Sequence, residues 1–121
     1  MSRVLVIEDE AASATAIRIH LARNGHDVRV VTEPNRVRDV AETFLPEVAL
    51  CDWLLGPGFD GLEISRALRE LAPGVRVVLM TGMPGEELER RLSTSPVDGV
   101  LYKPVSLRQL DAALEKALGA R

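Results

Sequence analysis

Aromatic residues make up only 3% of this 121-residue chain, so its core must be built from Val, Leu, Ile and Ala. The single cysteine, Cys51, excludes an internal disulfide and a cysteine zinc cluster. No apolar run is long enough to span a bilayer, and no secretory signal pattern is present, so we expect a cytoplasmic protein without membrane contact. The formal net charge of −3 argues against direct nucleic-acid binding, because phosphate binding favours a basic surface.

The apolar fraction of 46% is typical of a globular protein, and the length suits one domain covering residues 1–121. Short apolar runs alternate along the chain with stretches whose apolar residues recur at helical spacing. We expect the runs at residues 4–7, 28–31, 48–51, 75–80 and 97–102 to form strands. Strands that alternate with helices predict an α/β fold with one doubly wound parallel sheet, covered by helices on both faces.

Several helix boundaries are marked in the sequence. Asn24-Gly25 is expected to stop the first helix. Asp60 with Glu63, and Ser106 with Gln109, have the spacing of capping boxes that begin helices. The last helix is expected to bury one apolar face, which consists of Leu107, Leu110, Leu114 and Ala117.

Polar residues follow four of the five expected strands. Glu8 and Asp9 come after the first strand, Asp52 after the third, Thr81 after the fourth and Lys103 after the fifth. Taken singly, each residue has an ordinary explanation, since Asp often caps a helix, Thr favours strands and Lys before Pro is usually a surface residue. Open α/β sheets, however, form their sites at the carboxyl ends of the strands. We therefore expect these five residues to form one site.

These residue types suit phosphoryl transfer. Three neighbouring carboxylates raise one another's pKa unless a cation lies among them. Magnesium binds one or two carboxylates together with phosphate oxygens and water. A carboxylate can also act as a nucleophile and form an aspartyl phosphate. Because phosphoryl transfer depends mainly on positioning and charge neutralisation, an ammonium, a hydroxyl and a metal ion would complete such a site.

The same residues resemble those of response-regulator receiver domains in two-component signal transduction, including the chemotaxis regulators. The resemblance rests on the segments IEDE, LCDWLLGPGFDG, LMTG and YKP and covers essentially the whole chain. It implies a flavodoxin-like (β/α)5 fold with strand order 2-1-3-4-5. It also implies that Asp52 is the phosphoacceptor, that Thr81 and Lys103 bind phosphoryl oxygens, and that the Lys103-Pro104 bond is cis.

The resemblance further implies a cofactor and partners. Magnesium would be held by Glu8, Asp9, Asp52 and the backbone carbonyl of Leu54, with Asp9 the more direct ligand of the acidic pair. The phosphoryl donor would be a sensor histidine kinase or a histidine phosphotransfer protein. The chain would catalyse only its own phosphorylation and dephosphorylation. A downstream protein would bind along the fourth helix, fifth strand and fifth helix.

Three features depart from the family pattern. Gly56-Pro57-Gly58 lengthens the loop after Asp52 by about one residue. Val100 stands where many members carry a Tyr or Phe that turns inward on activation, so we expect the signal to pass through backbone movement of residues 82–85 instead. The acidic pair is Glu-Asp rather than Asp-Asp.

Three other interpretations fit the sequence less well. An enzyme of the haloacid-dehalogenase type also forms an aspartyl phosphate, but it needs a second Asp where this chain has Leu54. A nucleotide or flavin binder would be expected to carry a glycine-rich phosphate motif, and the sequence has none. A receiver that serves only as an interaction module is disfavoured by the complete set of site residues. The sequence leaves open whether the chain acts alone or belongs to a longer protein.

The remaining notable residues are expected to have structural roles. Cys51 reads as a small buried hydrophobe, and Trp53 is expected to pack under a helix. His20 and His26 lack metal-ligand spacing and are expected to be surface or half-buried residues.

Overall fold

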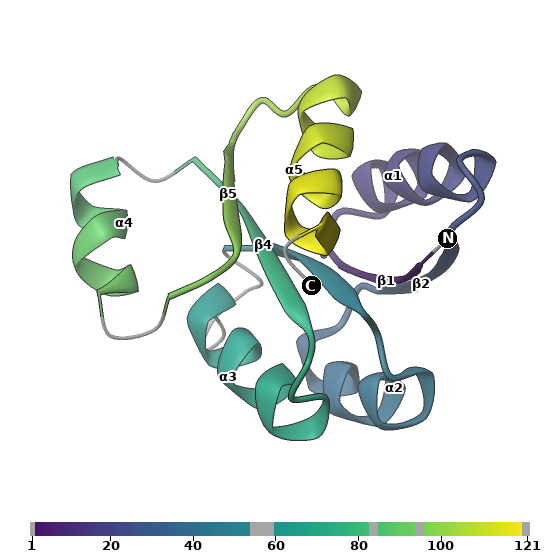
Figure 1. Cartoon of the computed structure of the whole chain (residues 1–121), viewed down its shortest axis with the longest axis horizontal. Helices are drawn as coiled ribbons and strands as arrows, with labels where there is room; N and C mark the ends of the chain where they lie inside the picture. Colours follow the sequence, from purple (N-terminus) through teal and green to yellow (C-terminus); the bar gives the residue numbers. More distant parts are fainter. Residues whose placement is uncertain (1, 54–59, 83–84, 94–95, 120–121) are drawn as a thin grey trace.

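The computed structural model describes residues 2–53, 60–82, 85–93 and 96–119 of the chain. One sheet is formed by the strands β1 (Arg3–Ile7), β2 (Asp27–Val31), β3 (Val48–Asp52), β4 (Arg76–Thr81) and β5 (Gly99–Tyr102). All neighbouring strands are parallel, and their order is β2-β1-β3-β4-β5 (Figure 1). The predicted α/β fold and strand order are therefore confirmed.

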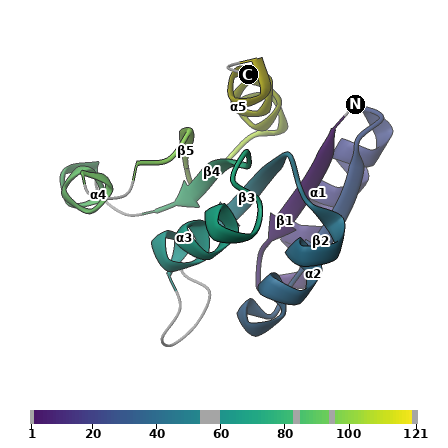
Figure 2. The same cartoon turned by 60° about the horizontal axis from the view of Figure 1, so that its bottom comes forward.

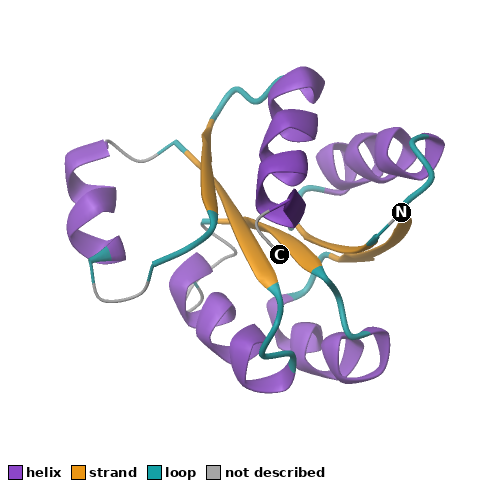
Figure 3. Cartoon of the chain, in the orientation of Figure 1, coloured by secondary structure: helices purple, strands orange, loops and turns teal. Residues whose placement is uncertain are grey.

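Helices cover both faces of this sheet. They are α1 (Ala11–Arg23), α2 (Val37–Phe44), α3 (Gly61–Leu71), α4 (Gly85–Leu92) and α5 (Leu107–Gly119), with a single 3-10 turn, η1, at Pro34–Arg36 before α2. Helices α1 and α5 lie on one face, α2 and α3 lie on the other, and α4 lies apart from them beside β5 (Figures 1 and 3). Figure 2 shows the same separation of α4 from a second direction.

The sheet divides the core into two clusters. In β1, Leu5 and Ile7 pack into the cluster beneath α2 and α3, whereas Val4 and Val6 pack into the cluster beneath α1 and α5. Residues of a strand point alternately to its two faces, so a strand buried on both faces is apolar at every position. This explains why the central strands read as continuous apolar runs.

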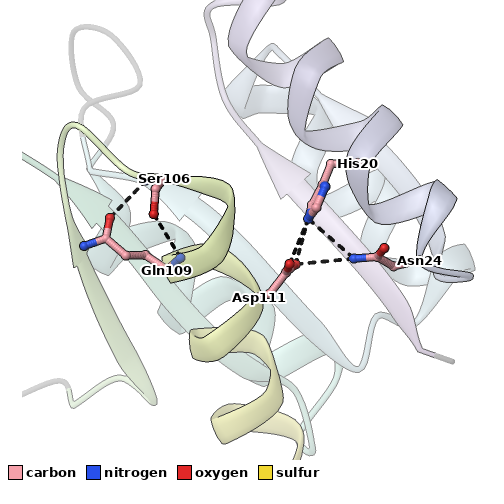
Figure 4. A network of polar contacts seen from close by, with 5 residues as sticks. All are labelled: His20, Asn24, Ser106, Gln109 and Asp111. Carbon is pink, nitrogen blue, oxygen red and sulfur yellow. Dashed lines mark hydrogen bonds and ion pairs between the residues drawn. The ribbon is translucent and has the colours of Figure 1, made fainter.

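Local signals place the helix ends where the sequence predicted them. Helix α1 stops at Asn24, and Gly25 follows with a φ of 90°, a left-handed conformation that glycine adopts without strain. At the start of α5, the Ser106 amide donates to Gln109 Oε1 at 2.9 Å and the Gln109 amide donates to Ser106 Oγ at 3.1 Å (Figure 4). Both halves of this predicted capping box are therefore present.

The fifth strand is shorter than predicted. It begins at Gly99 rather than at residue 97. Asp98, the residue before it, bonds to Val77 of β4 through its side chain as well as its backbone. The Val77 amide donates to Asp98 Oδ2 at 2.7 Å, while the Asp98 amide donates to the Val77 carbonyl at 2.8 Å. A side chain that takes a backbone donor in this way replaces a ladder bond and delays the strand.

The predicted buried face of α5 is wrong at one position. Leu110, Leu114 and Ala117 are buried, but Leu107 is 47% exposed. Leu107 is the first residue of α5, and it lies at the rim of the pocket above the carboxyl edge of the sheet. Helical spacing alone therefore extended the apolar face one turn too far.

A polar contact that the sequence did not reveal joins α1 to α5. His20 Nε2 lies 2.8 Å from Asp111 Oδ1, and the side-chain amide of Asn24 donates to the same carboxylate at 3.4 Å (Figure 4). His20 is half-buried, as expected for a histidine without metal-ligand spacing.

Among the described residues, no helix combines the length and apolar character needed to cross a membrane.

Candidate phosphoacceptor site

The carboxyl ends of the strands bring the predicted residues to one edge of the sheet. Glu8 and Asp9 follow β1, Asp52 ends β3, Thr81 ends β4 and Lys103 follows β5. Since β1, β3 and β4 are adjacent and parallel, Asp52 lies between the acidic pair and the strand that carries Thr81. The sequence argument from strand ends therefore located one set of neighbours rather than isolated residues.

Three carboxylates form a cluster at this edge. Oxygen atoms of Glu8, Asp9 and Asp52 all lie within 4.8 Å of one another. Glu8 and Asp52 are buried, and Asp9 is exposed, so the cluster has a closed side and a side open to solvent. An all-oxygen set of this kind is chemically suited to magnesium, which retains several waters beside one or two carboxylates. The fourth predicted ligand, the carbonyl of Leu54, lies outside the described residues.

Lys103 places a positive charge beside Asp52, the expected phosphoacceptor. Its Nζ lies 2.8 Å from Asp52 Oδ1. Partial burial lowers the pKa of Lys103, but the hydrogen bond to Asp52 and the charges of Asp52, Glu8 and Asp9 outweigh it, so the pKa is raised overall. Lys103 is therefore an ammonium at neutral pH and can donate to an oxygen bound at Asp52.

Glu8 has a pKa close to neutral pH. Its pKa is raised from an ordinary 4.5 to about 7: burial is the largest cause, the hydrogen bond and charge of Asp52 act in the same direction, and Lys103 acts in the opposite direction. A carboxyl group shifted by burial and a like charge is stabilised when a cation enters the same site. The single positive charge of Lys103 does not balance the three carboxyl groups of the cluster. A site with such an excess of negative charge can accept a cation.

An open pocket of about 690 Å³ lies over this edge of the sheet. Its lining includes the acidic cluster and Lys103, together with the apolar residues Ala16, Ile17, Val105 and Leu107. The exposed Leu107 described above therefore belongs to the rim of the site. Sequence reasoning placed it in the core and missed this role.

The polypeptide around the site has the expected backbone. The Lys103-Pro104 bond is cis, as the resemblance predicted. Thr81 is buried at the end of β4, and its carbonyl accepts from the Lys103 amide at 2.8 Å. The ends of β4 and β5 are thus joined at the two residues expected to bind phosphoryl oxygens.

Two residues beside Asp52 have the structural roles expected of them. Cys51 is buried, and burial raises the pKa of its thiol, so it is an inert core residue rather than a reactive one. Trp53 is 3% exposed and lies under α4, whose Arg91 approaches the ring. Val100, at the position where many family members have an aromatic ring, is partly buried against the same cluster as Trp53.

The fold and the site together define an α/β domain with a carboxylate cluster and a lysine at the carboxyl edge of its sheet. The sequence profile of the response regulator receiver domain matches residues 4–115. The chain therefore belongs to the response regulator receiver domain family, for which a phosphoryl-acceptor role is standard.

Individual relatives agree with this assignment. The chain is 30% identical over 120 residues to the phosphate regulon transcriptional regulatory protein PhoB of Rhizobium meliloti, covering 98% of this chain and 52% of that protein. It is 28% identical over 117 residues to the alkaline phosphatase synthesis transcriptional regulatory protein PhoP of Bacillus subtilis, covering 96% of this chain and 48% of that protein. The chain thus spans about half the length of these curated relatives.

Solved structures show the same architecture. The signal receiver domain of a modulated diguanylate cyclase from Desulfovibrio desulfuricans superimposes with a TM-score of 0.86 at 27% identity, covering 99% of this chain and 95% of that one. A CheY-like response regulator receiver domain protein from Methanospirillum hungatei gives a TM-score of 0.89 at 23% identity, with coverages of 99% and 95%. The second comparison establishes the shared fold.

Proposed function

We propose that Asp52 accepts a phosphoryl group from a sensor histidine kinase or a histidine phosphotransfer protein, in a magnesium-dependent reaction. The observation that carries this assignment is the position of Asp52 between opposite charges. Lys103 Nζ lies 2.8 Å from one of its oxygens, and carboxylate oxygens of Glu8, Asp9 and Asp52 lie within 4.8 Å of one another. No other carboxylate among the described residues combines burial, a bound ammonium and an acidic cluster of this kind.

In the proposed reaction, an oxygen of the Asp52 carboxylate attacks the phosphorus atom of the donor. A phosphorus–oxygen bond forms at Asp52, the bond between phosphorus and the donor nitrogen breaks, and its electron pair returns to the imidazole. The Lys103 ammonium and the Thr81 hydroxyl donate to the oxygens of the transferred group. Such donors stabilise charge that develops during the transfer.

Glu8, Asp9, Asp52 and the carbonyl of Leu54 are the proposed magnesium ligands. When bound, the ion would neutralise the acidic cluster and stabilise charge on the phosphoryl oxygens. Glu8 would then give up the proton that its raised pKa favours in the metal-free site. The protein itself would catalyse only its own phosphorylation and dephosphorylation.

The wider role proposed here is that of a cytoplasmic switch. Residues 1–121 would act as one receiver domain, without direct contact with nucleic acid or membrane. Phosphorylation would change the face formed by α4, β5 and α5, and a downstream protein would bind there. Tyr102 is 50% exposed at the end of β5 and would contribute an aromatic surface to this face.

Intact mass measured after incubation with acetyl phosphate and magnesium tests the assignment. The parent should gain one phosphoryl group, and Asp52→Asn should gain none. Asp39→Asn is the matched control, because it makes the same substitution at an exposed carboxylate on α2, away from the acidic cluster. A phosphoryl gain that persists in Asp52→Asn, or a parent that gains none with magnesium present, would contradict the proposal.

A further inference from the structure

Helix α4 makes a two-part contact beside the phosphoacceptor through a single arginine. The guanidinium carbon of Arg91 lies 5.6 Å from the centroid of the Trp53 ring, and Arg91 Nη1 lies 3.7 Å from Asp60 Oδ2. A cation over an aromatic face within about 6 Å is attracted by the ring. Arg91 therefore contacts one residue at the end of β3 and one at the start of α3.

The two residues that Arg91 contacts border residues 54–59, the segment that follows the phosphoacceptor in the sequence. Trp53 is the next residue after Asp52, and Asp60 is the N-cap of α3, where its side chain accepts from the Glu63 amide at 3.0 Å. Arg91 therefore contacts the described residues on either side of residues 54–59.

The backbone transmits this position to the site. The Trp53 amide donates to the Met80 carbonyl at 2.9 Å, and the Trp53 carbonyl accepts from the Gly61 amide at 2.9 Å. The start of α3 is thus hydrogen-bonded directly to the residue that follows Asp52. A shift of α3 at Gly61 would therefore be passed to the backbone beside Asp52.

Helix α4 has few other attachments to the body of the domain. Leu88 is its one buried residue, and Leu92 is partly buried against the same cluster. The helix also lies apart from the other helices (Figures 1 and 2). Arg91 therefore adds a polar attachment to the apolar contacts that Leu88 and Leu92 make with the core.

We propose that Arg91 is a positioning residue for phosphoryl transfer, which couples the place of α4 to the geometry of Asp52 through Trp53 and Asp60. This inference rests on the proposed function of Asp52. Phosphoryl transfer depends on a fixed geometry of the nucleophile, so release of this contact slows the reaction. By reciprocity, whatever moves α4 changes the site, and whatever changes the site moves α4.

The expected effect follows from the strength of such contacts. An exposed cation–π contact and an exposed ion pair together are worth a factor of about 3 to 10 in a local equilibrium. We therefore expect Arg91→Ala to lower the initial rate of phosphorylation by acetyl phosphate, at saturating magnesium, by about 3- to 10-fold. Arg90→Ala is the matched control, since it removes the same charge from the same helix and should stay within about twofold of the parent.

A double-mutant cycle with Asp60→Asn separates this route from general damage to the fold. Asparagine keeps the oxygen that caps α3 but removes the charge that pairs with Arg91. The combined Arg91→Ala and Asp60→Asn protein should therefore lose little more rate than Arg91→Ala alone, since that variant already lacks the ion pair. Arg91→Lys should recover part of the rate, because it restores the charge at Asp60 without the flat contact on Trp53.

Two further readouts report on α4 directly. Trp53 is the only tryptophan, so its fluorescence should change in Arg91→Ala and not in Arg90→Ala. Amide exchange in α4 should be faster in Arg91→Ala than in Arg90→Ala before any phosphorylation. Equal rates and equal exchange in the two variants, or faster phosphorylation in Arg91→Ala, would overturn this inference while Asp52 remains the acceptor. A parent that takes up no phosphoryl group would overturn the proposed function and this inference together.

Discussion

Glu8 makes the stability of the metal-free protein depend on pH in an unusual direction. Its folded-state pKa is raised from 4.5 to about 7, chiefly by burial, so the folded protein binds more protons than the unfolded chain between these values. The free energy of unfolding must then fall as the pH rises through this window. Most carboxylates that gain a partner on folding act in the opposite sense.

The magnitude can be bounded from the same shift. Each pKa unit corresponds to about 1.4 kcal/mol, which sets an upper limit of about 3 kcal/mol for Glu8. The pocket above the cluster is open to water, and screening there reduces the contribution to about 1 to 2 kcal/mol. Glu8→Gln keeps the shape of the protonated side chain and removes its titration. It should therefore be more stable than the parent by about 1 to 2 kcal/mol at pH 7.5, with near equality at pH 4.5.

Urea unfolding in EDTA, measured at several pH values between 4.5 and 7.5, checks this expectation. The quantity of interest is the difference between Glu8→Gln and the parent, because other titrating groups cancel in it. Glu42→Gln is the control, since it makes the same substitution at an exposed position on α2. A Glu8→Gln difference that stays constant across the window would refute the reasoning. Magnesium should reduce the difference or reverse its sign, because it stabilises the ionised cluster.

Two further predictions address the site and the packing beneath it. Lys103→Gln should lower the rate of phosphorylation by acetyl phosphate by about 100-fold or more, because it removes the ammonium proposed to bind a phosphoryl oxygen; a loss below tenfold would argue against that role. Gly61→Ala should cost about 1 to 3 kcal/mol in urea unfolding, since the new methyl would lie 2.8 Å from a buried leucine side chain. Gly99→Ala, where the nearest atom would be 3.5 Å away, should cost less, and equal losses would show that the close contact relaxes freely.

The fold was predictable because its signals are short-ranged and repeated. Apolar runs of four to six residues, separated by helical spacing and by turn residues, define a parallel sheet without any knowledge of tertiary contacts. The errors arose where one side chain changed the local balance. Asp98 bonds to Val77 and shortens β5, and the first residue of α5, Leu107, faces the pocket instead of the core.

The site was predictable for a related reason. Parallel strands end at the same edge, so the residue after each strand is placed by topology alone. The burial of each residue, by contrast, does not follow from the topology. Glu8 and Asp9 are neighbours in the sequence, yet only Glu8 is buried, because successive residues of an extended chain point to opposite sides. The raised pKa of Glu8 follows from that difference and could not be read from the acidic pair itself.

The polar side-chain contacts that α1 and α4 make with other elements could not be predicted from the sequence. His20 with Asp111, and Arg91 with Trp53 and Asp60, join elements whose relative rotation depends on how each helix packs on the sheet. No spacing rule connects residues that are 91 or 38 positions apart, as His20 and Asp111, or Trp53 and Arg91, are. Only the preference of arginine for aromatic faces and carboxylates could have nominated a partner.

The aromatic ring near the site belongs to Trp53 and not to position 100. Val100 has no ring to rotate, whereas Trp53 supplies a large buried ring in the same cluster, directly after the phosphoacceptor in the chain. A ring on β5 senses the site through space. The ring of Trp53 is instead joined to Asp52 by one peptide bond and carries Arg91 of α4 on its face. In this chain Trp53 therefore gives α4 a direct contact beside Asp52, in addition to the proposed output face that α4 shares with β5 and α5.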